Sequence, residues 1–125
     1  MTRRFLVRLA ATLTVAAVLG SAAYASCIPS TLTQQRSRAD VIFIGVALDN
    51  PTATGIQRFR VSRYLKSRGP RILRVSTGNI RRADGSGSVT SVSIVVSRGQ
   101  RWRIYAQGSV LRVLRTSVCD GSRRL

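Results

Sequence analysis

The longest apolar stretch after the amino-terminal segment runs from Ala39 to Leu48 and is rich in β-branched residues, which favour a pleated strand. Its apolar residues follow one another without alternation, which predicts a strand that is buried on both faces. Gly45 lies within it, and a glycine inside a strand is typical of a bulge or a bend. A strand of this kind lets a small antiparallel sheet coil and close into a barrel.

Shorter segments that alternate apolar and polar residues follow, separated by turns that contain glycine. This period of two predicts half-buried strands, and several short strands indicate an all-β barrel or sandwich. The expected strands are Ile56–Leu65, Arg71–Thr77, Ser88–Val96, Arg101–Gln107 and Val110–Thr116. Before the first strand, the sequence predicts a short helix with Ser30 as its N-cap and with Leu32 and Ala39 on its inner face.

Residues 1–25 have the pattern of a secretory signal peptide, with a basic start, an apolar centre and the small-residue sequence Ala23-Tyr24-Ala25. The apolar centre, Leu9 to Leu19, is shorter than the ~20 residues that a membrane-spanning helix needs. Cleavage after Ala25 would leave 100 of the 125 residues, from Ser26 to Leu125, as one small domain. We therefore expect a protein that is secreted or held in the cell envelope.

The chain has two cysteines, Cys27 and Cys119. Two cysteines in an exported chain most often pair, so we expect a disulfide between the two ends of the domain. The alternative is a lipoprotein acylated at Cys27, but Tyr24 stands where such sites normally carry leucine. Two cysteines without histidine or glutamate do not supply the four ligands of a structural metal site. We expect neither a metal ion nor a cofactor.

Charge is the most extreme feature of the composition. The chain has 21 basic and four acidic residues, a net charge of +17, and a pI near 12.0. Such a surface attracts anionic polymers and membranes. An arginine-rich composition that simply places arginine at solvated positions explains the charge equally well, so both interpretations stand. The arginines expected at outward strand positions are Arg58, Arg60, Arg71, Arg74, Arg101 and Arg103.

Enzymatic chemistry has few candidate residues in this sequence. Because the chain has no histidine and no glutamate, a serine or cysteine nucleophile would lack its usual base. The acidic residues fall at expected caps, loops and turns rather than as a converging pair. They are Asp40, Asp49, Asp84 and Asp120. We predict a protein without enzymatic activity.

Four segments resemble, in the same order along the chain, the motifs of bacterial netrin-like domains, which are similar to tissue inhibitors of metalloproteinases. They are Ala39–Gly45, Phe59–Lys66, the glycine-led Gly99–Ala106, and Leu114–Arg123 with its cysteine. The resemblance implies an exported, OB-fold-like barrel with disulfides at its ends. Together with the strand pattern, it predicts an all-β, closed or partly open antiparallel barrel of five to six strands with a short N-terminal helix.

The leading functional expectation is an exported netrin-like domain, residues 26–125, that binds an extracellular protein or an anionic envelope surface such as a polymer or a membrane. The resemblance also implies a metalloproteinase inhibitor that acts through its N-terminal edge, Ser26, Cys27 and Ile28. A third expectation is a polyanion-binding or nucleic-acid-binding OB-fold that uses the arginine face. Export argues against nucleic acid, and only Tyr64 and Tyr105 are expected outside the core as stacking platforms.

Overall fold

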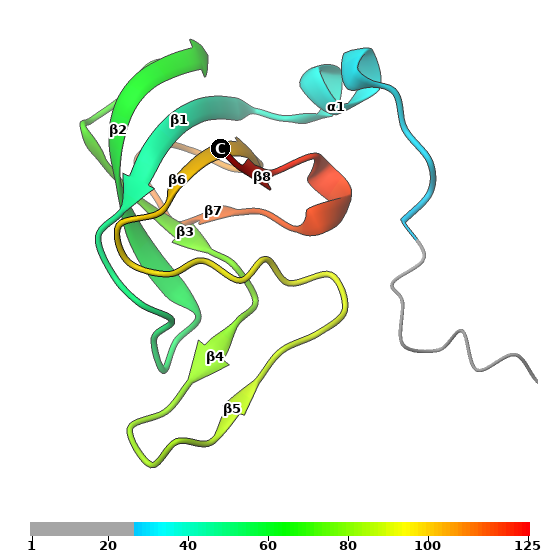
Figure 1. The fold of residues 1–125 in the computed structure, drawn as a ribbon. Coiled ribbons are helices and arrows are strands. Elements are labelled where there is room, and N and C mark those ends of the chain that lie inside the picture. Colours follow the sequence, from blue (N-terminus) through cyan, green and yellow to red (C-terminus); the bar gives the residue numbers. More distant parts are fainter. Residues whose placement is uncertain (1–26) are drawn as a thin grey trace, which may run out of the picture.

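The computed structural model describes residues 27–125, so the signal peptide expected over residues 1–25 and Ser26 lie outside the described residues. The fold is mostly β, with one short helix and a strongly curled sheet that forms a half-barrel (Figure 1). The elements in chain order are α1 (Leu32–Arg38), β1 (Val41–Ala47), β2 (Ile56–Lys66), β3 (Ile72–Ser76), β4 (Ile80–Arg81), β5 (Gly87–Ser88), β6 (Arg101–Ala106), β7 (Leu114–Arg115), the 3-10 turn η2 (Val118–Asp120) and β8 (Arg123–Arg124).

The main sheet has six strands in the order β7–β3–β2–β1–β6–β8. β3 and β7 run parallel, so the expectation of a purely antiparallel barrel was wrong. Because β6 runs opposite to β1 and β3, the reversal of the chain after β6 brings β7 beside β3 in the parallel direction. One antiparallel bridge between Gln107 and Arg115, with two backbone hydrogen bonds of 2.9 and 3.0 Å, ties the end of β6 to β7.

Strand β1 lies at the centre of the sheet and pairs with both β2 and β6. Its residues are buried on both faces apart from the half-buried Val46, as its continuous apolar sequence predicts. Its pairing with β2 shifts register twice, between Ile42 and Phe43 and between Ile44 and Gly45, which confirms the irregularity predicted at Gly45. A Cβ at Gly45 would lie 2.9 Å from the carbonyl oxygen of Arg60, so this close approach of β2 requires glycine.

The concave inner face of the sheet holds the core. Phe43 and Phe59 meet edge to face, with ring centroids 5.8 Å apart. Leu73 and Val75 from β3, and Trp102 and Ile104 from β6, join them there, as their alternation predicts. These inward positions confirm three of the predicted strands with nearly the predicted bounds: Ile56–Leu65, Arg71–Thr77 and Arg101–Gln107.

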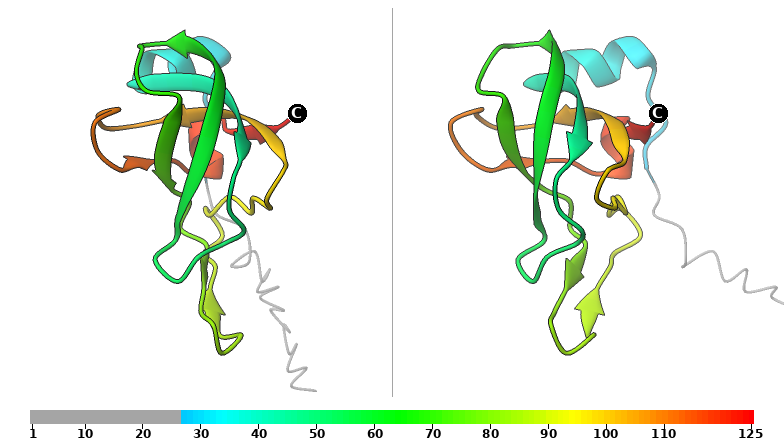
Figure 2. Two further views of the ribbon diagram at one scale, coloured as in Figure 1. Left: turned by 90° about the vertical axis from the view of Figure 1, so that its left-hand side faces the viewer. Right: turned by 60° about the vertical axis from the view of Figure 1, so that its left-hand side comes forward.

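The prediction of a strand over Ser88–Val96 was wrong. Ile94 and Val96 are buried in the core as its pattern required, but the segment pairs as a strand only at Gly87–Ser88, where β5 meets β4 in a hairpin that projects from the half-barrel (Figure 2). The side chain of Ser93 accepts a hydrogen bond from the Thr90 backbone at 3.1 Å, and the Ser93 backbone bonds to the Thr90 carbonyl. This local turn competes with strand pairing.

The predicted helix is present as α1, but its cap and its inner residue differ from the expectation. Thr31 rather than Ser30 is the N-cap, because Thr31 and Gln34 form a reciprocal capping box that Ser30 cannot form with its spacing. Leu32 is 45% exposed, so it does not share a buried inner face with Ala39. Ala39, at the C-cap, is buried and packs next to Ile42 and Tyr105.

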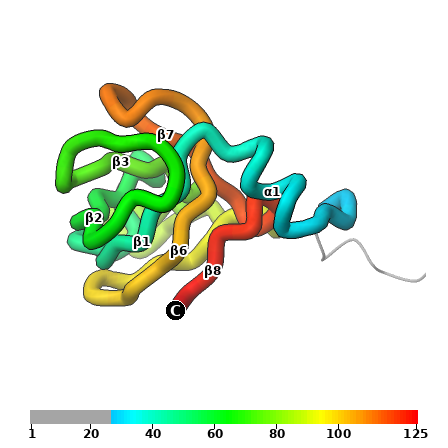
Figure 3. Tube along the Cα trace, turned by 90° about the horizontal axis from the view of Figure 1, so that it is seen from above, coloured from blue at the N-terminus to red at the C-terminus, as the bar shows by residue number. Residues whose placement is uncertain are grey.

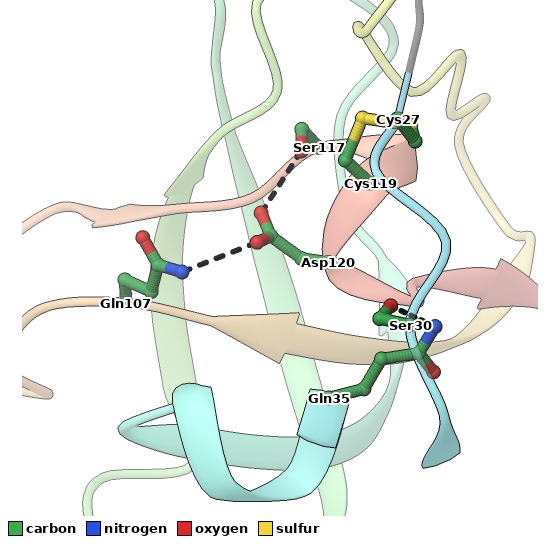
Figure 4. Close-up of a disulfide and its surroundings, with 7 residues drawn as sticks. All are labelled: Cys27, Ser30, Gln35, Gln107, Ser117, Cys119 and Asp120. Atoms are coloured by element: carbon green, nitrogen blue, oxygen red, sulfur yellow. Dashed lines mark hydrogen bonds between the residues drawn. A yellow bond between two sulfur atoms is a disulfide. The ribbon is translucent and has the colours of Figure 1, made fainter.

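The predicted disulfide between Cys27 and Cys119 is present, with Cα atoms 5.2 Å apart (Figure 4). It joins the start of the described chain to η2. Asp120 holds η2 in place by accepting hydrogen bonds from Ser117 at 3.0 Å and from Gln107 at 3.1 Å. A disulfide is compatible with an extracytoplasmic location.

Candidate anion-binding face

The convex outer face of β1 and its neighbours is the most unusual surface of the described chain. Ile42, Ile44 and Val46 alternate with the core residues of β1 and therefore point to this outer side. The residues paired with them across β2 and β6 are mostly cationic. We call the surface formed by these residues the outer face.

Along β2, the partners of Ile42, Ile44 and Val46 are Lys66, Arg63 and Arg60 in that order. Along β6, Ile44 and Val46 pair with Arg103 and Arg101. A row of apolar side chains thus runs between two rows of cations. The aliphatic stems of such long side chains cover apolar surface, which fits the 7% exposure of Ile44, while Ile42, at 4% exposed, also packs against Ala39 and Tyr105.

The six arginines named from the sequence divide into groups in the structure. Arg60 and Arg101 flank Val46, and Arg103 lies next to Ile44. Arg58 and Arg74 oppose each other on β2 and β3 and extend the same face. Arg71 is exposed but lies just before β3, outside the strand register, so it is not assigned to the face.

Three cations of the outer face escaped the sequence prediction: Arg63, Lys66 and Arg123. A strict period of two after Arg60 places Ser62 and Tyr64 outward. The two register shifts in the β1–β2 pair change the period, so that Arg60, Arg63 and Lys66 share one face. The predicted bulge at Gly45 was the one signal that could have revealed this spacing. Arg123 joins through β8, a strand without a sequence signal of its own.

Arg58 is the cation of this face that forms a salt bridge within residues 27–125. Its guanidinium makes two hydrogen bonds to Asp49, of 2.8 and 3.0 Å, and its backbone N–H donates a third to the same carboxylate. These hydrogen bonds lower the pKa of Asp49 below its ordinary value. Asp49 thereby compensates the repulsion expected between the opposed Arg58 and Arg74.

The other three aspartates serve loops and turns. Asp40 accepts a hydrogen bond from the Gly108 backbone, Asp84 accepts two from Ser86, and Asp120 accepts from Ser117 and Gln107. The hydrogen bonds from Ser86 lower the pKa of Asp84. Within the part of the chain that the structure describes, none of these three carboxylates forms a salt bridge, so the remaining arginines of the outer face have no acidic partner there.

At one side of the face, two arginines oppose each other directly. Arg103 on β6 pairs in register with Arg123 on β8, which runs beside β6 (Figure 3). Like charges at such paired positions repel. The Nε of Arg103 is also buried without a hydrogen-bond partner. An anion on this part of the face would relieve both costs.

The two tyrosines expected as stacking platforms do not serve that purpose. Tyr105, predicted to point outward into solvent, is 1% exposed and lies beneath Ala39 beside Ile42, because the end of α1 covers it. Tyr64 packs against the core and donates its hydroxyl to the Pro70 carbonyl, and its partial burial raises its pKa. The outer face therefore lacks the exposed aromatic rings that single-stranded nucleic-acid sites use.

The protease-contact edge predicted from the resemblance is described only in part. Ser26 lies outside the described residues, Cys27 is held in the disulfide, and Ile28 is 82% exposed. Ile28 is thus accessible to a partner.

No known protein family, curated protein or solved structure matches this chain. Among residues 27–125, no cluster of three or more histidine, cysteine, aspartate or glutamate side chains could hold a metal ion. The helix that these residues form is too short and too polar to cross a membrane. The properties of the outer face therefore carry the functional argument.

Proposed function

We propose that this protein is an exported, non-enzymatic binding domain whose outer face binds an anionic polymer of the cell envelope. The observation that carries the proposal is the pair of cation rows that flank the apolar row of β1, opposite few compensating acids. Export is supported by the signal-peptide pattern of residues 1–25 and by the compatible disulfide.

The shape of the face favours a polymer. The sheet is strongly curled, so its outer face is convex, and a flexible chain can follow it around β2, β1 and β6 (Figure 2). The cations are mainly arginines, whose planar guanidinium groups make paired hydrogen bonds to carboxylate, sulfate or phosphate groups. The lack of exposed aromatic rings favours a polymer recognised by its charge over a single-stranded nucleic acid.

The netrin-like identity and its OB-fold stay predictions, and we retain the netrin-like domain as the proposed family. A mostly β half-barrel, stapled at its ends by a disulfide, is compatible with that proposal. A shared fold would not by itself assign an inhibitory activity, since function resides in the site rather than in the fold.

The experiment measures binding of the exported protein to dextran sulfate over a series of salt concentrations. We compare Arg60→Gln/Arg101→Gln, which removes the two cations beside Val46, with Arg81→Gln/Arg82→Gln, which removes two exposed cations from the projecting hairpin segment. Both variants lose the same net charge. We expect the first variant to bind about tenfold more weakly, because two fixed contacts are removed. The slope of log affinity against log salt concentration should become shallower by about two.

The matched control should lose less than about threefold, since its arginines lie away from the outer face. Equal losses in the two variants would show that total charge, rather than this face, governs binding. An affinity that barely changes with salt would contradict the electrostatic proposal altogether.

A further inference from the structure

A pocket of about 600 Å³ lies between the last turn of α1 and the outer sides of β1, β2 and β6. Its volume falls within the ~300–1,000 Å³ that is common for small-molecule sites. Its lining combines an apolar wall with cations. The lining residues are Arg36, Ser37, Ile42, Leu65, Lys66, Arg103 and Tyr105. No acidic side chain is among them.

The cations around this pocket are positioned by the fold. The Lys66 ammonium donates hydrogen bonds to the carbonyl oxygens of Arg36 at 2.8 Å and Ser37 at 3.4 Å, at the carboxyl end of α1. Free carbonyl groups at a helix end attract a cation, and these bonds fix the side chain of Lys66 beside the pocket. Arg36, in the last turn of α1, adds a second positive charge.

Arg103 provides the strongest sign of a ligand. It lines the pocket, its Nε is buried, and that donor has no hydrogen-bond partner. A buried donor without an acceptor is rare in native proteins because its desolvation is not repaid. The residue paired with it across the sheet, Arg123, is another cation and offers no acceptor. A carboxylate or phosphate oxygen in the pocket would satisfy this Nε and relieve the repulsion.

The apolar wall determines the rest of the ligand. Leu65, at 41% exposed, supplies most of the accessible apolar surface of the lining, while Ile42 and Tyr105 are 4% and 1% exposed and close the pocket from below with little free surface. A free inorganic anion would leave Leu65 in contact with water. A ligand with an alkyl chain next to its charged group would cover it.

We propose that this pocket binds an amphipathic anion, which is one carboxylate or phosphate group carried on an alkyl chain. The anionic group bonds to Arg103 and lies close to Lys66 and Arg36, and the chain packs on Leu65. The site shares Arg103 and Lys66 with the outer face, but it extends beyond that face to Arg36, Ser37 and Leu65 and excludes Arg60 and Arg101.

The test is isothermal titration of the folded exported protein with monomeric decanoate and with monomeric decyl phosphate. We expect one binding site, which Arg103→Gln weakens about tenfold, because the variant loses a charge-assisted hydrogen bond. Arg103→Lys keeps the charge but lacks the Nε donor and should also lose severalfold in affinity. Arg101→Gln, two residues away on the same strand and outside the pocket, should change binding less than about twofold.

In case the Arg103 variants fail to fold, a second variant changes Leu65, which is exposed at the rim of the pocket. Leu65→Ala should weaken decyl phosphate about threefold, since it removes part of the apolar wall. Inorganic phosphate binding as tightly as decyl phosphate would overturn the alkyl-chain part of the proposal. Neutral decanol binding as tightly as decanoate, or an unchanged affinity in folded Arg103→Gln, would overturn the anionic part.

Vesicles distinguish the two sources of such a ligand. Binding of monomeric decyl phosphate together with vesicles of phosphatidylglycerol, both weakened by Arg103→Gln, identifies a membrane lipid headgroup. Binding of the monomer alone identifies a free amphiphile. Binding of dextran sulfate that survives Arg103→Gln while decyl phosphate binding is lost shows that the pocket binds its own ligand and that the polymer relies on the other cations of the outer face.

Discussion

Both faces of strand β1 are apolar, but their surroundings differ. On the inner face, Phe43 contacts other apolar side chains, and it is completely buried. On the outer face, Ile44 is buried almost as fully, but its paired neighbours are Arg63 and Arg103. One strand thus serves a core on one side and a cationic surface on the other.

This difference shows that burial alone does not identify a core. The inner face is stabilised by contact between apolar groups, which depends little on salt. The outer face buries its isoleucines under charged side chains, and it places like charges such as Arg103 and Arg123 opposite each other. Repulsion of this kind costs stability, which is typical of surfaces selected for binding rather than for folding.

The largest expected effect compares the two faces directly. Phe43→Ala should destabilise the protein by about 4 kcal/mol, because it opens a cavity in the inner core and removes the contact with Phe59. Ile44→Ala should cost about 2 kcal/mol, since the flexible stems around it can close over the gap. Urea unfolding of both variants measures the difference. Equal losses would mean that the outer row is packed as tightly as the core.

A substitution at Gly45 tests the register shift that places Arg63 and Lys66 on the outer face. Gly45→Ala should destabilise the protein by about 1–3 kcal/mol, because the added Cβ would lie 2.9 Å from the Arg60 carbonyl oxygen and 3.1 Å from the Phe43 ring. Thermal unfolding followed by circular dichroism measures this loss. Gly99→Ala, at a turn where a Cβ would meet no atom within 4 Å but φ is +85°, is the control for backbone strain alone. If the two variants lose the same stability, close packing at Gly45 is not its cause.

The smallest expected effect concerns the salt bridge between Arg58 and Asp49 on the outer face. Since the hydrogen bonds from Arg58 lower the pKa of Asp49, the ionised carboxylate contributes stability that is fully present above the ordinary value of 3.8. That contribution is lost as the pH falls below 3.8 through the lowered value. We expect Asp49→Asn to lower the thermal unfolding midpoint slightly at pH 6, and we expect this difference to shrink as the pH falls from about 4 toward 2.

Salt gives the control for the same pair. Because the pair is largely exposed, high salt should reduce the difference between Asp49→Asn and the unchanged protein at pH 6. A difference that persists at pH 2 and in high salt would come from the turn that Asp49 occupies and not from its charge.

Hydrophobic periodicity predicted the strands correctly where no local side-chain hydrogen bonds competed with strand pairing. The continuous apolar run predicted a central strand, and alternation predicted the inward positions of Leu73, Val75 and Ile104. It failed over Ser88–Val96, because the serine and threonine hydroxyls of that segment bond to nearby backbone groups and form a turn. The pattern still identified Ile94 and Val96 as buried, since burial depends on the side chain and not on strand pairing.

The candidate sites were less accessible to prediction. Arg60, Arg101 and Arg103 were identified as outward-facing, but their neighbours Arg63, Lys66 and Arg123 required the register of three strand pairs. Tyr105 was assigned to the surface by alternation, whereas the end of α1 covers it. Alternation tells which side of a sheet a residue faces, and it carries no information on what packs against that side.

By itself, the sequence determined the central strand with its bulge at Gly45, the pairing of the two cysteines and the excess of positive charge. These features are local or depend on composition, so they need no knowledge of distant neighbours. Only the tertiary structure decided that β1 separates a core from a cationic face, and that Arg103, Lys66 and Arg36 surround one pocket. Those residues come from three elements far apart in the chain, and the curl and register of the sheet bring them together.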